Sequence, residues 1–169
     1  MSLKNLAALG CVLLLQACGI KQFTPHEYPL RAGLIAPIEA SGPVNVTNAQ
    51  DSTEQAVVFS YGGNGLQTNY HAVTELMVQQ TTKELQKASH IGDGKPKSMA
   101  LKVSFLESDY AGFHYRSKIV VQAALGDGSV VDLTVTHASG DPIQDLNGCV
   151  AEAVMKLLND ARIHAYLAS

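Results

Sequence analysis

The sequence predicts an α+β fold in which a single, mostly antiparallel sheet carries two helices on one face, as a two-layer sandwich. Apolar and polar residues alternate over 99–105, 113–125 and 131–135, which is the period of a strand with one covered face. Apolar residues recur at spacings of three and four over 68–90 and again after Asp141, which is the period of an amphipathic helix. Half-polar strands and one-sided helices bury their apolar surfaces most simply against each other.

Two strands are predicted before the first helix. Residues 44–48 form a short one, and residues 55–61 a stronger one that is rich in β-branched and aromatic residues. The run Gly62-Gly63-Asn64-Gly65 interrupts the second strand. The connection that follows, through the helix at 68–90 to Met99, is suited to a crossover between parallel neighbours.

The helix at 68–90 and the three strands after it have the clearest patterns. Tyr70, Val73, Met77, Leu85 and Ala88 mark the buried stripe of the helix, and its other face carries Gln, Thr, Lys and Glu. A compact hairpin turn of Gly, Asp and Gly separates the last two strands. The side chains expected to face the helices are Met99, Leu101, Val103 and Phe105, then Phe113, Tyr115, Ile119, Val121, Ala123 and Leu125, then Val131, Leu133 and Val135.

The start of the last helix is marked by helix-capping residues. Asp141 is suited to cap the free N–H groups, Pro142 to occupy the first helical position, and Gln144 to complete a capping box. The expected buried stripe consists of Leu146, Val150, Ala153, Val154, Leu157, Leu158 and Ala161.

The N-terminus has the pattern of an export signal. Lys4 precedes an apolar run over 6–15, which is too short to span a bilayer but has the length of a signal-peptide core. The run ends in Leu15-Gln16-Ala17-Cys18, which resembles the lipobox of bacterial lipoproteins. That resemblance implies diacylglycerol on the Cys18 sulfur, removal of residues 1–17 and acylation of the new amino terminus. Each buried methylene contributes about 0.8 kcal/mol, so several acyl chains form a durable anchor.

Two alternatives to this interpretation remain: a different cleavage site, and a segment that is not cleaved at all. Ala8-Leu9-Gly10-Cys11 also looks like a lipobox, although only a short apolar run precedes it. The segment is otherwise read as a buried N-terminal helix. In lipoprotein sorting, Asp after the modified cysteine retains a protein in the inner membrane, and this chain has Gly19 there. We therefore expect attachment to the outer membrane, facing the periplasm.

The expected organisation is a signal peptide at 1–17, the lipidated Cys18 with a Pro-rich tether at 18–43, and a periplasmic α+β domain at 44–169. The tether holds four prolines, which disfavour helix, although its second half has apolar residues suited to pack on the domain. Without residues 1–17 the chain has 152 of its 169 residues, enough for one domain, and 11 of its 12 basic side chains against 15 acidic ones, a net charge of −4. This balance argues against a nucleic-acid partner.

The sequence contains no catalytic, cofactor or metal motif of comparable strength. Cys149 is expected to be a buried, inert thiol in the last helix rather than a redox site. Gly62 to Gly65 lack the Lys-Ser/Thr of a phosphate-binding loop. Lys102, His114, Arg116 and Lys118 form a mild basic patch, either a solvated sheet face or a contact for an anionic partner. The histidines fall singly and are expected at the surface or as caps: His26, His71, His90, His114, His137 and His164.

The layout resembles the YajG-type lipoproteins of Gram-negative bacteria. The resemblance rests on the lipobox, on the strand Phe113-His114-Tyr115-Arg116-Ser117-Lys118-Ile119 and on the final segment Asn159-Asp160-Ala161-Arg162-Ile163-His164-Ala165-Tyr166-Leu167. It implies an outer-membrane lipoprotein with no catalytic residues to transfer. Auxiliary lipoproteins of envelope ABC transporters for lipids are similar in layout.

We therefore expect a non-enzymatic accessory or assembly factor of the cell envelope, with no cofactor. Its expected contacts are the bilayer, through the acyl anchor on Cys18, and an envelope protein whose identity the sequence does not reveal. The alternative is a transport auxiliary that binds lipid or a transporter component. An exposed strand edge or an apolar groove would be the structural sign of such binding.

Overall fold

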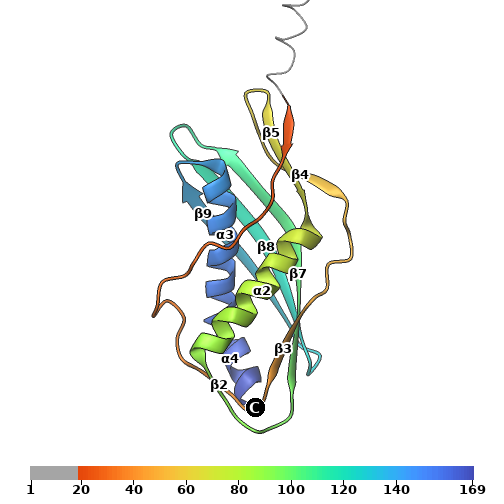
Figure 1. Cartoon of the computed structure of the whole chain (residues 1–169), viewed down its shortest axis with the longest axis vertical. Coiled ribbons are helices and arrows are strands. Elements are labelled where there is room, and N and C mark those ends of the chain that lie inside the picture. Colours follow the sequence, from red (N-terminus) through yellow and green to blue (C-terminus); the bar gives the residue numbers. More distant parts are fainter. Residues whose placement is uncertain (1–18) are drawn as a thin grey trace, which may run out of the picture.

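The computed structural model describes residues 19–169, and its centre is an antiparallel meander of three long strands (Figure 1). These are β7 (Lys97–Tyr110), β8 (Tyr115–Leu125) and β9 (Val130–Ser139), as the alternating patterns predict. The predicted signal peptide at 1–17 and the predicted lipidation site Cys18 lie outside the described residues.

Four further strands complete a seven-stranded mixed sheet in the order β1-β5-β4-β7-β8-β9, with β3 also paired to β7. The start of β7 pairs in parallel with β3, and its far end meets β4 through Phe59 and Ser108. The predicted parallel neighbours are therefore present, and the α+β class is confirmed. The added strands are β1 (Ile20–Gln22), β3 (Val44–Asn48), β4 (Gln55–Tyr61) and β5 (Asn64–Asn69); β2 (Ile38–Ala40) and β6 (Ser89–Ile91) form a separate parallel pair.

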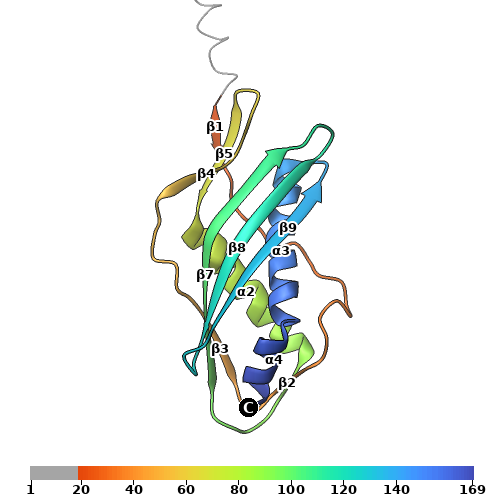
Figure 2. The same cartoon turned by 180° about the vertical axis from the view of Figure 1, so that it is seen from behind.

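The two long helices, α2 (Tyr70–Ala88) and α3 (Pro142–Leu158), lie on the same face of the sheet, in front of it in Figure 1 and behind it in Figure 2. Asn69 caps α2 by accepting from Ala72 N–H. Asp141 caps α3 by accepting from the N–H groups of Ile143 and Gln144, as predicted. Fully buried side chains fill the helix–sheet interface, among them Met77, Met99, Leu101, Leu106, Ile119, Leu146, Leu157 and Leu158.

The prediction that Phe105 and Phe113 face the helices is wrong. A β-bulge between Val103 and Phe105 reverses the alternation, so Leu106 is fully buried and Phe105 lies on the other face. Phe113 lies in the turn between β7 and β8 and is fully exposed. Alternation alone locates neither an inserted residue nor the end of a strand.

The last predicted helix is two helices. α3 ends at Leu158, and a second N-cap, Asp160, accepts from Arg162 N–H and starts α4 (Ala161–Ala168). The change of direction exposes Ala161, which the predicted stripe would bury, and buries Ile163 and Leu167 instead.

Gly62 and Gly63 form a tight hairpin turn rather than a simple interruption. Both have positive φ, 58° and 79°, and they join the paired residues Tyr61 and Asn64. Two consecutive positive φ angles suit the twist of a two-residue hairpin. The turn leads into β5, a polar strand that the sequence analysis does not anticipate.

Candidate functional site

The segment at 23–37, here called the strap, crosses α3 on the side away from the sheet and then runs beside the C-terminal part of α2 (Figure 1). It belongs to the stretch that the sequence assigns to a tether. β1, immediately before it, pairs with β5, and β2, immediately after it, pairs with β6. Phe23 is only 2% exposed and Ile38 is fully buried. The stretch over 20–40 is thus packed on the domain.

Three amide side chains on the helices hold the backbone of the strap. Asn147 Oδ1 accepts from His26 N–H at 3.0 Å, and Gln80 Nε2 donates to the Tyr28 carbonyl at 2.9 Å. Asn159 makes two bonds, accepting from Ala36 N–H at 2.9 Å and donating to the Leu34 carbonyl at 2.8 Å. Amides suit this task because each has both a donor and an acceptor. They fix the path of a segment that has no regular secondary structure.

Several polar side chains of α2 are buried, and the strap accounts for Gln80, whose amide donates to it. Gln80 and Thr81 are buried, and the Glu84 carboxylate is 8% exposed and pairs with Lys87 Nζ at 2.6 Å. On the sequence pattern these residues belong to a solvated face. Lys83 reaches from the same helix to Glu27 of the strap at 2.6 Å.

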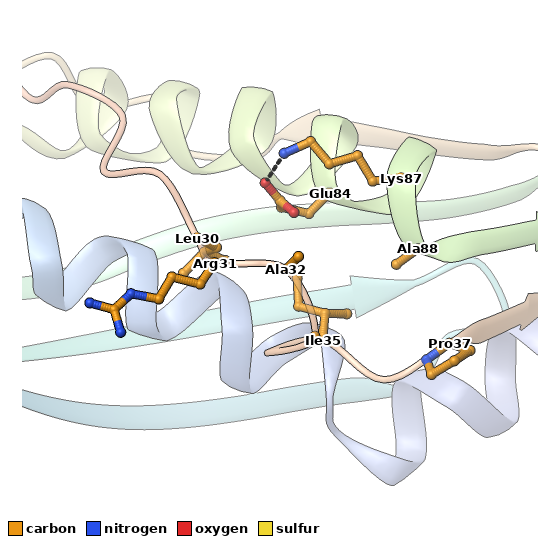
Figure 3. A pocket seen from close by; sticks show the side chains of 9 residues that line it. Leu30, Arg31, Ala32, Ile35, Pro37, Glu84, Lys87 and Ala88 are labelled. Carbon is orange, nitrogen blue, oxygen red and sulfur yellow. Dashed lines mark hydrogen bonds and ion pairs between the residues drawn. The ribbon is translucent and has the colours of Figure 1, made fainter.

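A pocket of about 380 Å³ opens between the strap and the C-terminal part of α2 (Figure 3). Its apolar lining includes Leu30, Ile35 and Ala88, and its charged lining is Arg31, Lys87 and Glu84. Figure 3 shows the Arg31 side chain extending away from the Glu84–Lys87 pair. The lining has no Ser, Thr, Cys or His to act as a nucleophile or base among the described residues. The lining combines apolar surface with charged groups, which is suited to contact with an amphipathic group.

A second pocket, of about 280 Å³, lies on the α3 side of the strap and contains a His–Glu pair. His137 Nδ1 lies 3.1 Å from Glu152 Oε2, and Lys156 Nζ lies 3.2 Å from Glu152 Oε1. Partial burial raises the pKa of Glu152, but the hydrogen bonds from His137 and Lys156 outweigh it, and the pKa lies below its ordinary value. Both oxygens of the carboxylate already have a partner, and the residues lining the pocket include no adjacent nucleophile.

Asp145 is the polar group that the sequence analysis missed. It is fully buried in the first turn of α3, where the helix dipole favours negative charge. Its Oδ2 accepts from Ser108 of β7 at 2.7 Å and also from Ser117 of β8. The carboxylate thereby ties the start of α3 to the meander. Its position in the helical pattern gives no sign of burial, because the bulge in β7 is what turns Ser108 inward.

Cys149 is a structural residue, as predicted. Its side chain is fully buried and its Sγ lies 3.8 Å from the Val135 carbonyl. Burial raises the pKa of the thiol to about 12. The thiolate that redox or nucleophilic chemistry requires is therefore disfavoured in the folded protein.

We expect this thiol to resist alkylation in the native protein at pH 8 and to react readily in urea. Because the folded pKa of about 12 exceeds the ordinary value of 9.0, the unfolded chain loses this proton first as pH rises. The thiol's contribution to stability is complete below pH 9 and is lost between about pH 9 and 12. Timed labelling with iodoacetamide and mass spectrometry measures the first effect; equal rates in both states would contradict burial.

The basic patch is interleaved with acidic residues. Glu107 occupies the register position opposite Lys118, and Asp109 the position opposite Arg116. Lys118 also lies over the Phe105 ring, 5.8 Å from its centroid. This face of the sheet is therefore of mixed charge, which favours a solvent-exposed surface over a contact for an anionic partner.

Four of the histidines, His26, His71, His137 and His164, contact single neighbouring groups in the fold. His71 Nδ1 hydrogen-bonds the Gln50 carbonyl, and His164 Nε2 lies 2.7 Å from the Leu158 carbonyl. His26 meets Asn147 and His137 meets Glu152, while His90 is exposed. Within residues 19–169 no three His, Cys, Asp or Glu side chains cluster as metal ligands. Over the same range, no helix has both the length and the apolar character needed to cross a bilayer.

No protein-family model and no curated protein matches the sequence. Among solved structures, a DUF330-family protein from Xanthomonas campestris is similar, with a TM-score of 0.46, 19% identity, and coverage of 83% of this chain and 93% of that one. A candidate lipoprotein from Caulobacter crescentus has a TM-score of 0.40, 16% identity, and coverage of 57% of this chain and 84% of its own. Both likenesses are too distant to assign a function, and YajG-type membership stays a prediction.

Proposed function

We propose that the protein is a lipoprotein anchored through Cys18 in the outer membrane, facing the periplasm, and that its domain is a non-enzymatic accessory or assembly factor. The partner binds by adding a strand to the free edge of β9. The anchor keeps the domain at high effective concentration near other envelope proteins.

The observation that carries this proposal is the open edge of the sheet at β9. Val130–Ser139 is ten residues long and pairs with β8 along one side, while its other side has no strand partner among residues 19–169. Such an edge presents unpaired N–H and C=O groups to an incoming strand. Asp132 is the one acidic residue along it, so little charge opposes pairing.

The filled interior supports this role over the alternatives. A lipid carrier needs an apolar cavity between helices and sheet, and large side chains such as Met77, Leu106 and Leu146 occupy that space. An enzyme needs converging polar groups in a cleft, and the two pockets beside the strap present paired charges instead. A transport auxiliary that binds a transporter protein remains the second candidate, because it would use the same strand edge.

Photo-crosslinking in intact cells tests the proposal. With a photoreactive amino acid at Thr134 or Ala138, both exposed on β9, we expect a covalent adduct with one envelope protein. The matched control is Ser104, which is exposed on the central strand β7, away from the edge. Mass spectrometry of the adduct identifies the partner, and a transporter component there would select the second candidate.

Equal adducts from Ser104 and the β9 positions would contradict edge pairing. An adduct containing only two copies of this chain would replace the accessory role by self-association.

A further inference from the structure

The chain enters the sheet almost directly at the proposed anchor. Gly19 follows Cys18, and its carbonyl accepts a hydrogen bond from Gly65 N–H at 3.3 Å. Ile20 is already the first residue of β1, paired with Gly65 of β5. Consecutive Cα atoms are about 3.8 Å apart, so the acylated residue lies within one residue's reach of the sheet. The folded domain begins at the anchor, with no spacer between them.

The turns β4–β5 and β7–β8 lie at the same end of the long axis as β1, and the C-terminus lies at the opposite end (Figures 1 and 2). We call this end the anchor-side tip and define it by Ile20, Tyr61, Tyr110 and Phe113. They are 55%, 53%, 38% and 101% exposed. Acyl chains leaving residue 18 therefore emerge beside a group of exposed apolar and aromatic side chains.

The tip residues Tyr61 and Tyr110 form a row of rings with Tyr115, one from each of β4, β7 and β8. The rings of Tyr61 and Tyr110 are 4.2 Å apart between centroids, and those of Tyr110 and Tyr115 are 5.5 Å apart. Phe113 lies on the turn between β7 and β8 with its side chain exposed. Backbone hydrogen bonds hold this turn, such as the one from Phe113 N–H to the Ala111 carbonyl at 3.1 Å. The turn therefore needs no aromatic side chain at this position. Burial within the domain does not explain Phe113.

The exposed charges near the tip are mixed, and Lys21 is the basic group closest to the proposed anchor. Lys21 follows Ile20 and lies opposite Leu66 in the register, whereas Arg116 lies opposite Asp109. Basic groups near a membrane surface are attracted to anionic head groups, and aromatic side chains favour the interfacial layer. Tyrosine has the apolar ring and polar tip that this layer accommodates.

We propose that the anchor-side tip docks onto the lipid bilayer, with Phe113 inserted among the head groups and acyl chains and the long axis of the domain directed away from the membrane. The site is thus a lipid-surface contact additional to the acyl chains, and it fixes the orientation of the domain. This inference rests on the proposed acylation of Cys18. A flexible spacer would leave the orientation free, and the path of β1 removes that spacer.

Tryptophan fluorescence tests the docking, because the chain contains no Trp. The full-length protein, processed in cells and purified from membranes, is reconstituted into vesicles of phosphatidylethanolamine and phosphatidylglycerol as Phe113→Trp. Its control is Val130→Trp, a half-exposed apolar position in the strand end next to the β8–β9 turn, at the opposite end of the molecule. We expect Phe113→Trp to emit at shorter wavelength in vesicles and to be quenched by lipids brominated near the head group. Val130→Trp should keep the emission and quenching of a water-exposed indole.

The outcomes separate this inference from the proposed function. Protein that carries the acyl mass and floats with vesicles, but whose Trp at position 113 is unquenched, overturns the docking and leaves the anchor in place. Equal quenching of both variants overturns the fixed orientation. A blue shift without quenching by brominated lipid shows a protein covering the tip, which also overturns the lipid contact. Absence of the acyl mass at Cys18 overturns anchor and docking together.

Discussion

Replacing Cys18 by Ser is expected to release the protein from the membrane fraction completely or to leave it as an unprocessed precursor. The sulfur of Cys18 is the proposed site of the diacylglycerol, and a hydroxyl does not replace it in that thioether. A single acyl chain binds a bilayer only marginally, whereas several chains hold it durably, so losing the modification removes the whole anchor. Membrane fractionation and mass spectrometry of the N-terminal peptide measure the effect.

Cys11→Ser is the matched control, because Cys11 belongs to the rival lipobox-like run. It should leave anchoring and the mass of the mature protein unchanged. Release by Cys11→Ser with retention of Cys18→Ser would move the anchor to position 11 and add seven residues before the domain. An unmodified thiol at Cys18 in mature wild-type protein would contradict the anchoring altogether.

Phe23→Ala is expected to lower the free energy of unfolding by about 3–5 kcal/mol, the usual cost of truncating a buried Phe. Phe23 is 2% exposed, and its N–H donates to the Gln67 carbonyl at 2.7 Å. Since the net stability of a domain is about 5–15 kcal/mol, this loss is a large fraction of the total. Urea titration of the mature protein in mild detergent, with circular dichroism as the readout, measures the free energy of unfolding.

Tyr28→Ala provides the control within the same strap. Its side chain is 49% exposed, and the strap bond at this residue uses the backbone carbonyl, which the substitution keeps. We expect a change within about 0.5 kcal/mol, as for most surface substitutions. A Phe23→Ala protein as stable as the wild type would mean that the strap is a detachable tether after all.

The sequence predicts best where one local rule acts alone. The meander is predicted by the alternation of apolar and polar residues. The start of α3 is predicted by Asp141, because helix capping depends only on the next few residues. The predicted orientation of Phe105 is wrong because a bulge adds one residue to the alternating pattern. The bulge occurs in the pairing of β7 with β8, which the local sequence does not reveal. Prolines correctly exclude helix from the strap, but they do not reveal the helices on which it packs.

The candidate sites also differ in whether they depend on a local motif or on segments that are distant in the sequence. Cys18 is predicted from a linear motif and stays a prediction, whereas the pockets beside the strap exist only once it packs on α2 and α3. The buried Gln80 shows why the polarity pattern of the sequence does not predict the packing of the strap on α2. An amide in a helical sequence looks solvent-facing until a distant carbonyl, here that of Tyr28, is brought against it.

The residue that follows β2, Ser41, is hydrogen-bonded to the segment at 167–169, and this junction bears on the order of folding. Ser41 N–H donates to the Leu167 carbonyl at 2.8 Å, and its hydroxyl donates to the Ser169 carbonyl at 2.7 Å. Ser41 and Ser169 are 128 positions apart in the sequence, so this contact forms only when most of the domain has come together. Pairings of such long sequence separation carry a high loop-closure entropy, so we expect the junction of Ser41 with the segment at 167–169 to be among the last contacts to form during folding.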